Sequence, residues 1–236
     1  MEQLKNKNIL ILGATGGIGA NLLKLLTNSG ANVWMAGRSQ DKLQTLSQEN
    51  KIPNDRVFQV DLAAANALHL FIEKIQPISF DIFINAAGIG IIKPLEQLAV
   101  SEMQLSFQVN VLSIFEIVKS ILPKMIEVKK GLIINIPGIL GKTPMSGAAA
   151  YCSSKYALVG MMQSIREELK RTEIRITQVY LGGVDSPFWD TINLRVQREK
   201  MIQSEEAAKS IWFLCQQPTS GVVSEMVLQP FNHQVI

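Results

Sequence analysis

Two side chains that together can move a proton, Tyr151 and Lys155, lie four residues apart in a stretch with helical periodicity. On a helix this spacing places both on one face, about 6 Å apart along the axis. An ammonium group favours the ionised form of a nearby phenol, so we expect Lys155 to lower the pKa of Tyr151 and make it a usable proton donor near pH 7. A Tyr-x-x-x-Lys pair also occurs commonly by chance.

A third polar side chain, Asn110, interrupts an apolar stripe. The stripe has helical spacing and consists of Met103, Phe107, Ile114, Ile121 and Met125. A buried amide costs stability unless it is hydrogen-bonded. Asn110 therefore indicates either a functional group or a satisfied hydrogen bond in the core.

A glycine-rich turn, Gly13-Ala14-Thr15-Gly16-Gly17-Ile18-Gly19, follows the first apolar run. Glycines let the backbone approach a pyrophosphate closely, and the helix that starts there offers N–H donors and the positive end of its dipole. The spacing is G-x-x-x-G-x-G rather than G-x-G-x-x-G, so the strand-turn-helix setting is what favours a dinucleotide site. A tight strand-to-helix turn without a ligand is the alternative.

Charged residues follow the next two predicted strands. Arg38 comes after Gly37, where a carboxylate would indicate NAD, and a guanidinium there can instead pair with the 2′-phosphate of NADP. An exposed arginine near a helix start is the alternative interpretation. Asp61 and Leu62 end the third strand, where a carboxylate can accept a hydrogen bond from an adenine amino group.

Short apolar runs alternate with longer helical stretches along the chain. The predicted strands are 8–12, 32–36, 56–60, 80–85, 131–136, 175–180 and 221–228, and the predicted helices are 17–28, 41–48, 64–75, 101–127, 149–171 and 204–216. Apolar strands joined by helical crossovers predict an α/β fold, namely a single Rossmann-type doubly wound domain over residues 1–236, with about seven parallel strands and helices on both faces. Residues 185–203 are predicted to form an insertion over the sheet edge.

Two of the predicted helices begin with local start signals. Ser101 and Gln104 have the spacing of a capping box. Ser204 precedes Glu205 and Glu206, whose negative charges are favourable at the positive end of a helix dipole.

Composition limits the environment and the partners. Of 236 residues, 47% are apolar and 18% are charged, with a net charge of +3, so a buried core is expected and neither a nucleic-acid nor a membrane surface is indicated. The longest uncharged apolar stretch, 82–92, is too short to span a membrane. Lys5 and Lys7 precede a glycine-broken run without a signal cleavage site. Two cysteines, Cys152 and Cys215, argue against a disulfide-stapled secreted protein and favour the cytoplasm.

Together these residues resemble the short-chain dehydrogenase/reductase family, in its single-domain branch, over nearly the whole chain. The resemblance rests on motifs in the family's order and spacing, which are Gly13-x-x-x-Gly17-x-Gly19, Asp61, Asn85-Ala86-Ala87-Gly88, Asn110 and Tyr151-x-x-x-Lys155. Another Rossmann-like enzyme, such as a methyltransferase, would leave Tyr151 and Lys155 unexplained.

The resemblance implies an oxidoreductase that transfers a hydride between NADP, with NAD possible, and a small-molecule carbonyl or secondary alcohol. It implies that Tyr151 is the acid/base, that Lys155 holds the nicotinamide ribose, and that Asn110 positions a proton-relay water. It implies no metal. The cofactor contacts that it implies, besides Tyr151 and Lys155, are Gly13, Thr15, Gly17, Ile18, Gly19, Arg38, Asp61, Leu62, Asn85, Ala86, Gly88, Gly182 and Val184.

The site departs from the family pattern at the place of a serine that binds the substrate carbonyl. Thirteen residues before Tyr151 this chain has Gly138. Three further positions also differ from the family pattern: Leu12 and Ser186 each stand in the place of a usual threonine, and Leu181 stands in a turn that usually reads Pro-Gly. Losing one oxyanion donor typically lowers turnover by about 10² to 10³-fold. We therefore expect normal NADPH binding, slow carbonyl reduction, and a faster reaction in Gly138→Ser.

Other hydroxyl groups near the site are candidates to compensate for the missing serine, namely Thr143, Ser146 and Ser153. If none does, the alternative function is a dinucleotide-binding protein of the same fold with weak or no dehydrogenase activity.

Apolar residues near the site favour a lipophilic substrate, although they would also suit an ordinary packed lid. They are Met145, Phe188, Trp189, Ile192 and the segment 89–92. The two long helices 101–127 and 149–171 carry much apolar surface, and such helices pair between subunits in the resembling family, so a homodimer or homotetramer is expected. Alternatively, Val159, Met161 and Met162 simply complete the core of the monomer.

Overall fold

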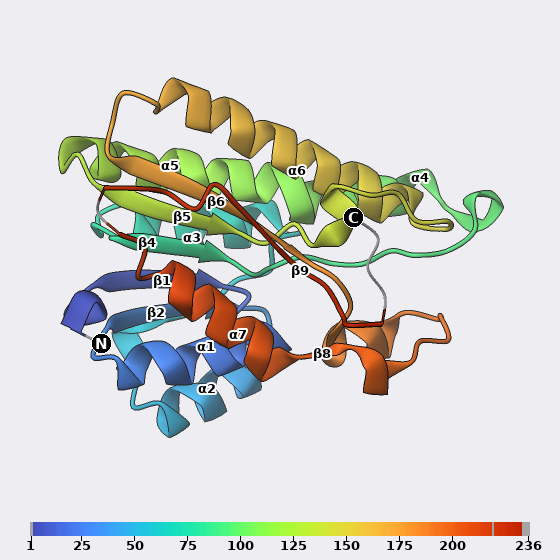
Figure 1. The fold of residues 1–236 in the computed structure, drawn as a ribbon, viewed down its shortest axis with the longest axis horizontal. Helices are drawn as coiled ribbons and strands as arrows, with labels where there is room; N and C mark the ends of the chain where they lie inside the picture. The colour runs from blue at the N-terminus through green and yellow to red at the C-terminus, as the bar shows by residue number, and fades with distance from the viewer. Residues whose placement is uncertain (1, 219, 233–236) are drawn as a thin grey trace.

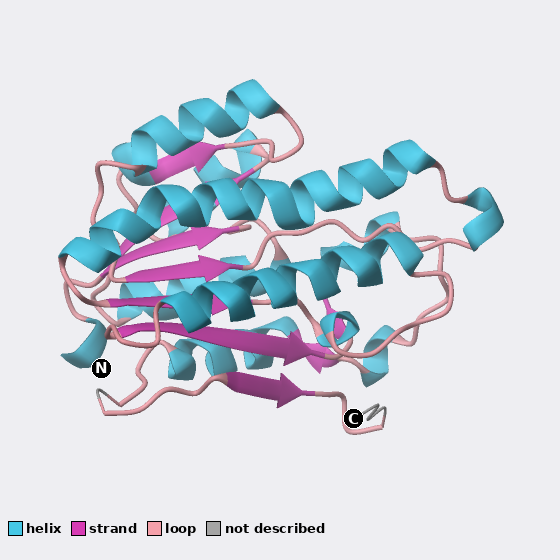
Figure 2. Ribbon diagram, turned by 90° about the horizontal axis from the view of Figure 1, so that it is seen from above, coloured by secondary structure: helices cyan, strands magenta, loops and turns pink. Residues whose placement is uncertain are grey.

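The computed structural model describes residues 2–218 and 220–232. A seven-stranded parallel sheet forms its centre, in the order β3-β2-β1-β4-β5-β6-β9, and the strand arrows in Figure 2 point the same way. The strands are β1 (Asn8–Leu12), β2 (Asn32–Gly37), β3 (Val57–Gln59), β4 (Ile82–Asn85), β5 (Gly131–Asn135), β6 (Ile174–Leu181) and β9 (Glu225–Leu228). The order reverses direction between β1 and β4, and ligands bind beyond the carboxyl ends of the strands at such a point.

Helices cover both faces of the sheet, with α1, α2 and α7 on one side and α3, α5 and α6 on the other (Figure 1). The helices are α1 (Gly17–Asn28), α2 (Gln40–Glu49), α3 (Ala65–Ile75), α4 (Val100–Phe107), α5 (Ser113–Glu127), α6 (Ala149–Glu168) and α7 (Ser204–Leu214). The predicted doubly wound α/β fold is therefore confirmed.

Helices pack on both faces of the sheet because its strands are apolar on both faces. In β1, Ile9 and Ile11 pack into the core under α1 and α7, whereas Leu10 packs into the core under α3, α5 and α6. All three side chains are fully buried. Successive strand residues point to opposite faces, so an unbroken apolar run requires helices on each side.

The predicted helix 101–127 differs from the observed one. The observed helix begins at Val100 and contains a π-helical turn, η4 (Gln108–Leu112), between α4 and α5. Its start is capped by Glu102, whose carboxylate accepts a hydrogen bond from the Ala99 N–H at 2.9 Å, so the predicted capping box of Ser101 and Gln104 is wrong. The other predicted start is confirmed, because α7 begins at Ser204 with its two glutamates in the first turn.

Four strands are shorter than predicted, namely β3, β4, β5 and, most of all, β9. A 3₁₀ turn at Asn54–Arg56 occupies the start expected for β3. The last strand pairs with β6 only from Glu225 onward, so residues 221–224 lie outside the strand.

The predicted insertion at 185–203 lies over the carboxyl edge of the sheet, where β7 (Val184–Asp185) pairs with β8 (Ile202–Gln203), and Figure 1 shows it in orange beside the start of α7. Arg198 holds this segment together. Its guanidinium donates to Asp185 at 2.6 Å, to Asp190 at 2.7 Å and to the Ser186 carbonyl at 3.0 Å.

Among the described residues, one continuous helix, 100–127, is long and apolar enough to cross a membrane. Half of its most apolar window is buried inside the protein. Ile114, Ile117 and Ile121 on its inner face are at most 1% exposed. Residues 100–127 therefore form a core helix.

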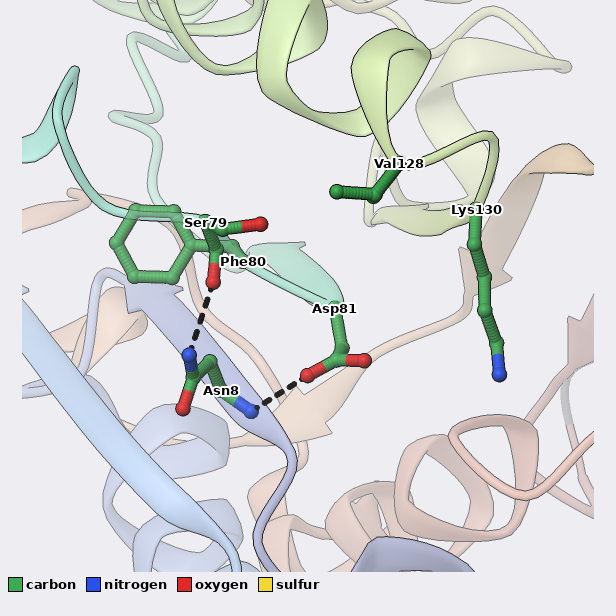
Figure 3. A pocket seen from close by; sticks show the side chains of 6 residues that line it. All are labelled: Asn8, Ser79, Phe80, Asp81, Val128 and Lys130. Atoms are coloured by element: carbon green, nitrogen blue, oxygen red, sulfur yellow. Dashed lines mark hydrogen bonds between the residues drawn. The ribbon is translucent and has the colours of Figure 1, made fainter.

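A hollow of about 230 Å³ lies at the amino ends of the strands, lined by Asn8, Ser79, Phe80, Asp81, Val128 and Lys130 (Figure 3). Its polar groups bond to one another: the Asn8 N–H donates to Asp81, and the Asn8 amide donates to the Ser79 carbonyl, both at 2.9 Å. These bonds tie strand starts together at the sheet edge opposite the glycine-rich turn. The hollow contains none of the predicted site residues.

Candidate active site

The glycine-rich turn lies between β1 and α1 and is packed too tightly for larger residues. Gly13 has φ +83°, and a Cβ there would lie 2.7 Å from the Ala86 backbone. A Cβ at Gly19 would overlap the Gly13 carbonyl oxygen, and one at Gly37 would lie 2.9 Å from the Thr15 side chain. Small residues thus keep the start of α1, with Ile18 in its first turn, close to the ends of β1 and β2.

No side chain caps the start of α1 at Gly16. The first N–H groups of a helix have no partner within it, and they favour an anion. The tightly packed turn 13–19 and the uncapped start of α1 together form a site that we call the cradle. Such a site suits the pyrophosphate of a dinucleotide. Ser186 in the insertion lies close by, 2.8 Å from a Cβ built on Gly17.

Arg38 lies directly after β2 and is exposed. The next residue, Ser39, caps α2 by accepting a hydrogen bond from the Lys42 N–H at 3.4 Å. Within the part of the chain that the structure describes, no hydrogen bond or ion pair joins the Arg38 guanidinium to another group. The side chain is therefore available to a phosphate at the end of β2.

Asp61 is exposed after β3, and Leu62 beside it is buried. One Asp61 oxygen accepts a hydrogen bond from the Ala63 N–H at 2.9 Å, so the carboxylate also stabilises the turn into α3.

Asn85 belongs to a row of buried amides that crosses three strands. Asn85 donates to Asn135 at 2.8 Å, and Asn135 donates to Gln178 at 2.8 Å. All three are fully buried and in register across β4, β5 and β6. Asn135 and Gln178 were not predicted, although a polar residue inside an apolar strand is the same signal that singled out Asn110.

The structure brings Lys155 of α6, Asn110 of η4 and Gly88 after β4 together. A Cβ at Gly88 would lie 2.8 Å from Lys155 Nζ and 3.0 Å from Asn110 Oδ1. Lys155 Nζ lies 5.6 Å from the centre of the Tyr151 ring. The predicted proton-transfer residues therefore lie at one place, beside the loop that begins with Asn85 and Ala86.

Burial dominates the titration of both Tyr151 and Lys155. It lowers the pKa of Lys155 to about 8, so the ammonium form still predominates at pH 7. It raises the pKa of Tyr151 above its usual value, with a smaller contribution from Cys152. The expected lowering of the Tyr151 pKa by Lys155 is therefore wrong for this structure, because burial removes the hydration that an ionised phenolate would need. Tyr151 is present as the protonated phenol, the form that donates.

Gly138 faces Tyr151, since a Cβ there would lie 4.0 Å from the phenol oxygen. Its φ of +74° and ψ of 172° form a backbone conformation that is essentially restricted to glycine. A serine at 138 would be strained, so the expected gain from Gly138→Ser does not follow from this backbone. Two of the candidate replacement hydroxyls are engaged locally: Thr143 donates to the Ile139 carbonyl at 3.2 Å, and Ser153 donates to the Ala149 carbonyl at 2.7 Å.

An apolar wall lies beside Tyr151. The Phe188 ring is 5.6 Å from the Tyr151 ring, centre to centre. A Cβ at Gly90 would overlap the Phe188 ring and lie 3.1 Å from Ile192 Cδ1. The insertion and the segment 89–92 thus meet beside Tyr151.

Gly182 and Val184, the remaining predicted cofactor contacts, follow β6 at the same sheet edge. The Gly182 N–H donates to the Leu228 carbonyl at 2.8 Å. The Val184 carbonyl accepts a hydrogen bond from the Trp189 indole at 3.0 Å, which ties the insertion to the end of the sheet.

A parallel sheet with a glycine-rich, uncapped helix start at its switch point defines a dinucleotide-binding α/β protein. A family model described as short chain dehydrogenase matches residues 7–197. The chain therefore belongs to the short-chain dehydrogenase family and is an oxidoreductase of a family that binds NAD(P). Among the described residues, no group of three His, Cys, Asp or Glu side chains is placed to hold a metal ion.

Similar proteins span the whole chain. An uncharacterized oxidoreductase of Staphylococcus epidermidis is 25% identical, and one of Staphylococcus aureus is 28% identical; each alignment covers 98% of this chain and 100% of the relative. The crystal structure of a metagenomic short-chain oxidoreductase in complex with NADP is 27% identical, with a TM-score of 0.81, covering 97% of this chain and 98% of that one.

Proposed function

We propose that this protein, as one dinucleotide-binding domain over residues 1–236, transfers a hydride between NADP(H) and a carbonyl or secondary alcohol of a lipophilic small molecule. The observation that carries the proposal is the meeting of Tyr151, Lys155 and Asn110 beside Gly88, at the sheet edge that also holds the glycine-rich cradle. The similar metagenomic oxidoreductase in complex with NADP supports the choice of cofactor.

Each residue group has a separate task in this proposal. The start of α1 binds the pyrophosphate, Arg38 pairs with the 2′-phosphate, Asp61 and Leu62 contact the adenine, and Asn85 to Gly88 contact the adjoining ribose. Lys155 holds the nicotinamide ribose. Bound NADPH supplies the hydride.

Tyr151 donates the proton that neutralises the substrate oxygen. Its raised pKa keeps the phenol protonated before the reaction. Asn110 donates both amide protons, to the Ile89 carbonyl and to Ser154. The Asn110 amide therefore has no proton left to donate to a proton-relay water.

Titration of NADPH and NADH, followed by an assay with a panel of lipophilic aldehydes and ketones, tests the proposal. We expect saturable NADPH binding and oxidation of NADPH that depends on the carbonyl. If neither dinucleotide binds, the proposal is wrong.

Gly138 favours the second candidate function, a dinucleotide-binding protein with weak or no dehydrogenase activity. With no hydroxyl at 138, and with the Thr143 and Ser153 hydroxyls engaged by the backbone, the substrate carbonyl is oriented by fewer donors. Normal NADPH binding without turnover of any carbonyl in the panel would support this second function.

Replacing Arg38 with alanine should remove mainly the preference for NADPH. A hydrogen bond to a charged group contributes about 1.5 to 3 kcal/mol, so we expect the NADPH dissociation constant to rise about 10- to 150-fold and that of NADH to change little. Titration of both dinucleotides measures the two constants. Lys42→Ala, which removes an exposed cation from α2, should leave both unchanged, and a wild-type protein that binds NADH as tightly as NADPH would contradict the assignment.

We propose a homodimer or homotetramer that pairs through α4, α5 and α6. Val159 and Met162 are buried, and Met161 is partly buried against the core. Other apolar side chains on these helices and on η4 nevertheless stay exposed, namely Leu105 (40%), Leu112 (49%), Phe115 (45%) and Tyr156 (43%). They lie on elements that contact one another, and a contiguous exposed apolar patch is typical of an interface.

Light scattering at micromolar concentration should therefore give at least twice the monomer mass. Phe115→Lys should lower that mass, because it buries a charge in the proposed interface. Leu70→Lys is the matched control, since Leu70 is 57% exposed but lies on α3. A monomeric wild-type mass would refute the assembly.

We place the protein in the cytoplasm. Both cysteines are free and buried, as suits a reducing compartment.

A further inference from the structure

Three fully buried polar side chains, Ser106, Asn110 and Ser154, form a cluster where α4 and η4 pack against α6. Asn110 Oδ1 accepts a hydrogen bond from the Ile89 N–H at 2.9 Å, and Asn110 Nδ2 donates to the Ile89 carbonyl at 3.0 Å. The same nitrogen donates to Ser154 Oγ at 2.9 Å. The cluster therefore connects the loop after β4 to the helix that carries Tyr151 and Lys155.

The hydrogen bonds of this cluster are complete only with the Ser154 hydroxyl. An asparagine amide has two protons to donate, and Asn110 gives one to Ile89 and the other to Ser154. Ser154 has a single proton, which it donates to the Tyr151 carbonyl at 2.8 Å. Its oxygen is thus both the acceptor for Asn110 and a direct link to the backbone of Tyr151.

Ser106 supports this arrangement from a greater distance. Its hydroxyl lies 3.1 Å from both the Ala150 carbonyl and Ser154 Oγ, whereas Asn110 Nδ2 lies 3.4 Å from it. Without Ser154, the second Asn110 proton would have only this longer contact. To shorten the contact with Ser106, the Asn110 amide would have to turn away from Ile89. This would disturb the two hydrogen bonds between Asn110 and the Ile89 backbone.

The π turn makes this contact possible. Asn110 is at the centre of η4 (Gln108–Leu112), which is held by a hydrogen bond from Ser113 Oγ to the Leu62 carbonyl at 2.7 Å. A π turn inserts an extra residue into a helix and is frequently found at functional sites. Here it occurs where an amide must reach both the loop after β4 and α6.

We propose that Ser154 is a positioning residue for the site described above. By accepting from Asn110 and donating to the Tyr151 carbonyl, it fixes the turn of α6 that carries Tyr151 and Lys155 relative to Gly88 and Ile89. The proposal rests on the proposed function, because the positioned groups are those that hold the nicotinamide ribose and donate the proton.

The test compares Ser154→Ala with Ser153→Ala. Ser153 is its neighbour on the same helix. Its hydroxyl donates to the Ala149 and Ala150 carbonyls of that helix and lies 3.6 Å from Met103 Sδ of α4. Single-turnover hydride transfer from NADPH, its pH profile and the NADPH dissociation constant are measured for both variants. Since a 1 Å misplacement at a site can cost about 10²-fold in rate, we expect a loss of about 10- to 100-fold in Ser154→Ala. NADPH affinity should change much less, and Ser153→Ala should behave like wild type.

A purely structural role would lower only the stability of Ser154→Ala, with the rate and pH profile of wild type, and that outcome would overturn the proposal. Ser154→Cys nearly preserves shape but has weak hydrogen bonding, so it gives the same test if the alanine variant does not fold. We expect slower hydride transfer and an altered pH profile in the cysteine variant as well. Wild-type kinetics in Ser154→Cys would also overturn the proposal.

A second measurement separates this proposal from the proposed function. If the wild-type protein turns over no carbonyl, the proposed function fails, but the Lys155 pKa remains measurable by NMR titration of labelled lysine. Loosening of the site would admit water, so the Lys155 pKa should rise toward the ordinary lysine value in Ser154→Ala and stay unchanged in Ser153→Ala. An unchanged Lys155 pKa in both variants would refute the positioning role whether or not the enzyme is active.

Discussion

Tyr151→Phe is expected to lose about 10² to 10⁴-fold in the rate of hydride transfer while binding NADPH normally, because it removes only the phenol oxygen that donates the proton. The ring stays in place against Phe188, 5.6 Å away between centres, so the apolar wall keeps its shape. Single-turnover oxidation of NADPH with a reactive carbonyl measures the rate. Fluorescence titration of NADPH measures binding.

Tyr156→Phe is the matched control for this experiment. Tyr156 is on the same helix, but its side chain is 43% exposed and has no part in the site. We expect this variant to keep the wild-type rate. A Tyr151→Phe variant as fast as Tyr156→Phe would show that another group donates the proton.

Gly19→Ala is expected to disrupt the cofactor cradle. The added Cβ would overlap the Gly13 carbonyl oxygen and lie 2.8 Å from Ala14 Cα, and both of these atoms are backbone. Backbone cannot rotate away, so the turn must move, and overpacking of this kind typically costs about 1 to 3 kcal/mol. Because the displaced turn is the one proposed to bind the pyrophosphate, NADPH binding should weaken as well. Urea unfolding and NADPH titration measure the two effects.

Gly160→Ala is the control, since Gly160 is also inside a helix but a Cβ there would meet nothing within 4 Å. It should keep wild-type NADPH affinity and gain up to about 1 kcal/mol in stability, the usual difference between the two residues in a helix interior. Equal NADPH affinity in the two variants would contradict a tightly packed cradle.

The sheet and its helices could be predicted from the sequence because their signals are local. Unbroken apolar runs such as 9–12 and 132–134 require cover on both faces, and the joining helices carry their own periodicity. The predictions were wrong where local signals compete. Glu102 rather than Ser101 stabilises the start of α4, and η4 interrupts a helix whose apolar period gave no sign of an extra residue.

The residue types and spacings of the candidate site could also be identified from the sequence. Tyr151 and Lys155 share a helix, so their relation follows from helix geometry alone. The glycines at 13, 17 and 19 share one turn. Arg38 was identified because it directly follows a strand.

Only the tertiary structure decided how these groups are surrounded. Ser106 and Ser154 are 48 residues apart, and Asn85 and Asn135 are 50 apart, so their hydrogen bonds depend on how elements pack and not on any local pattern. Burial raises the Tyr151 pKa, although the spacing of Tyr151 and Lys155 alone indicates a lower one. The sequence places Gly138 thirteen residues before Tyr151, but only the folded backbone shows that its φ of +74° restricts this position to glycine. Hydration, long-range contacts and backbone dihedral angles are properties of the packed chain, and this is why residue spacing determined the chemical groups but not their environment.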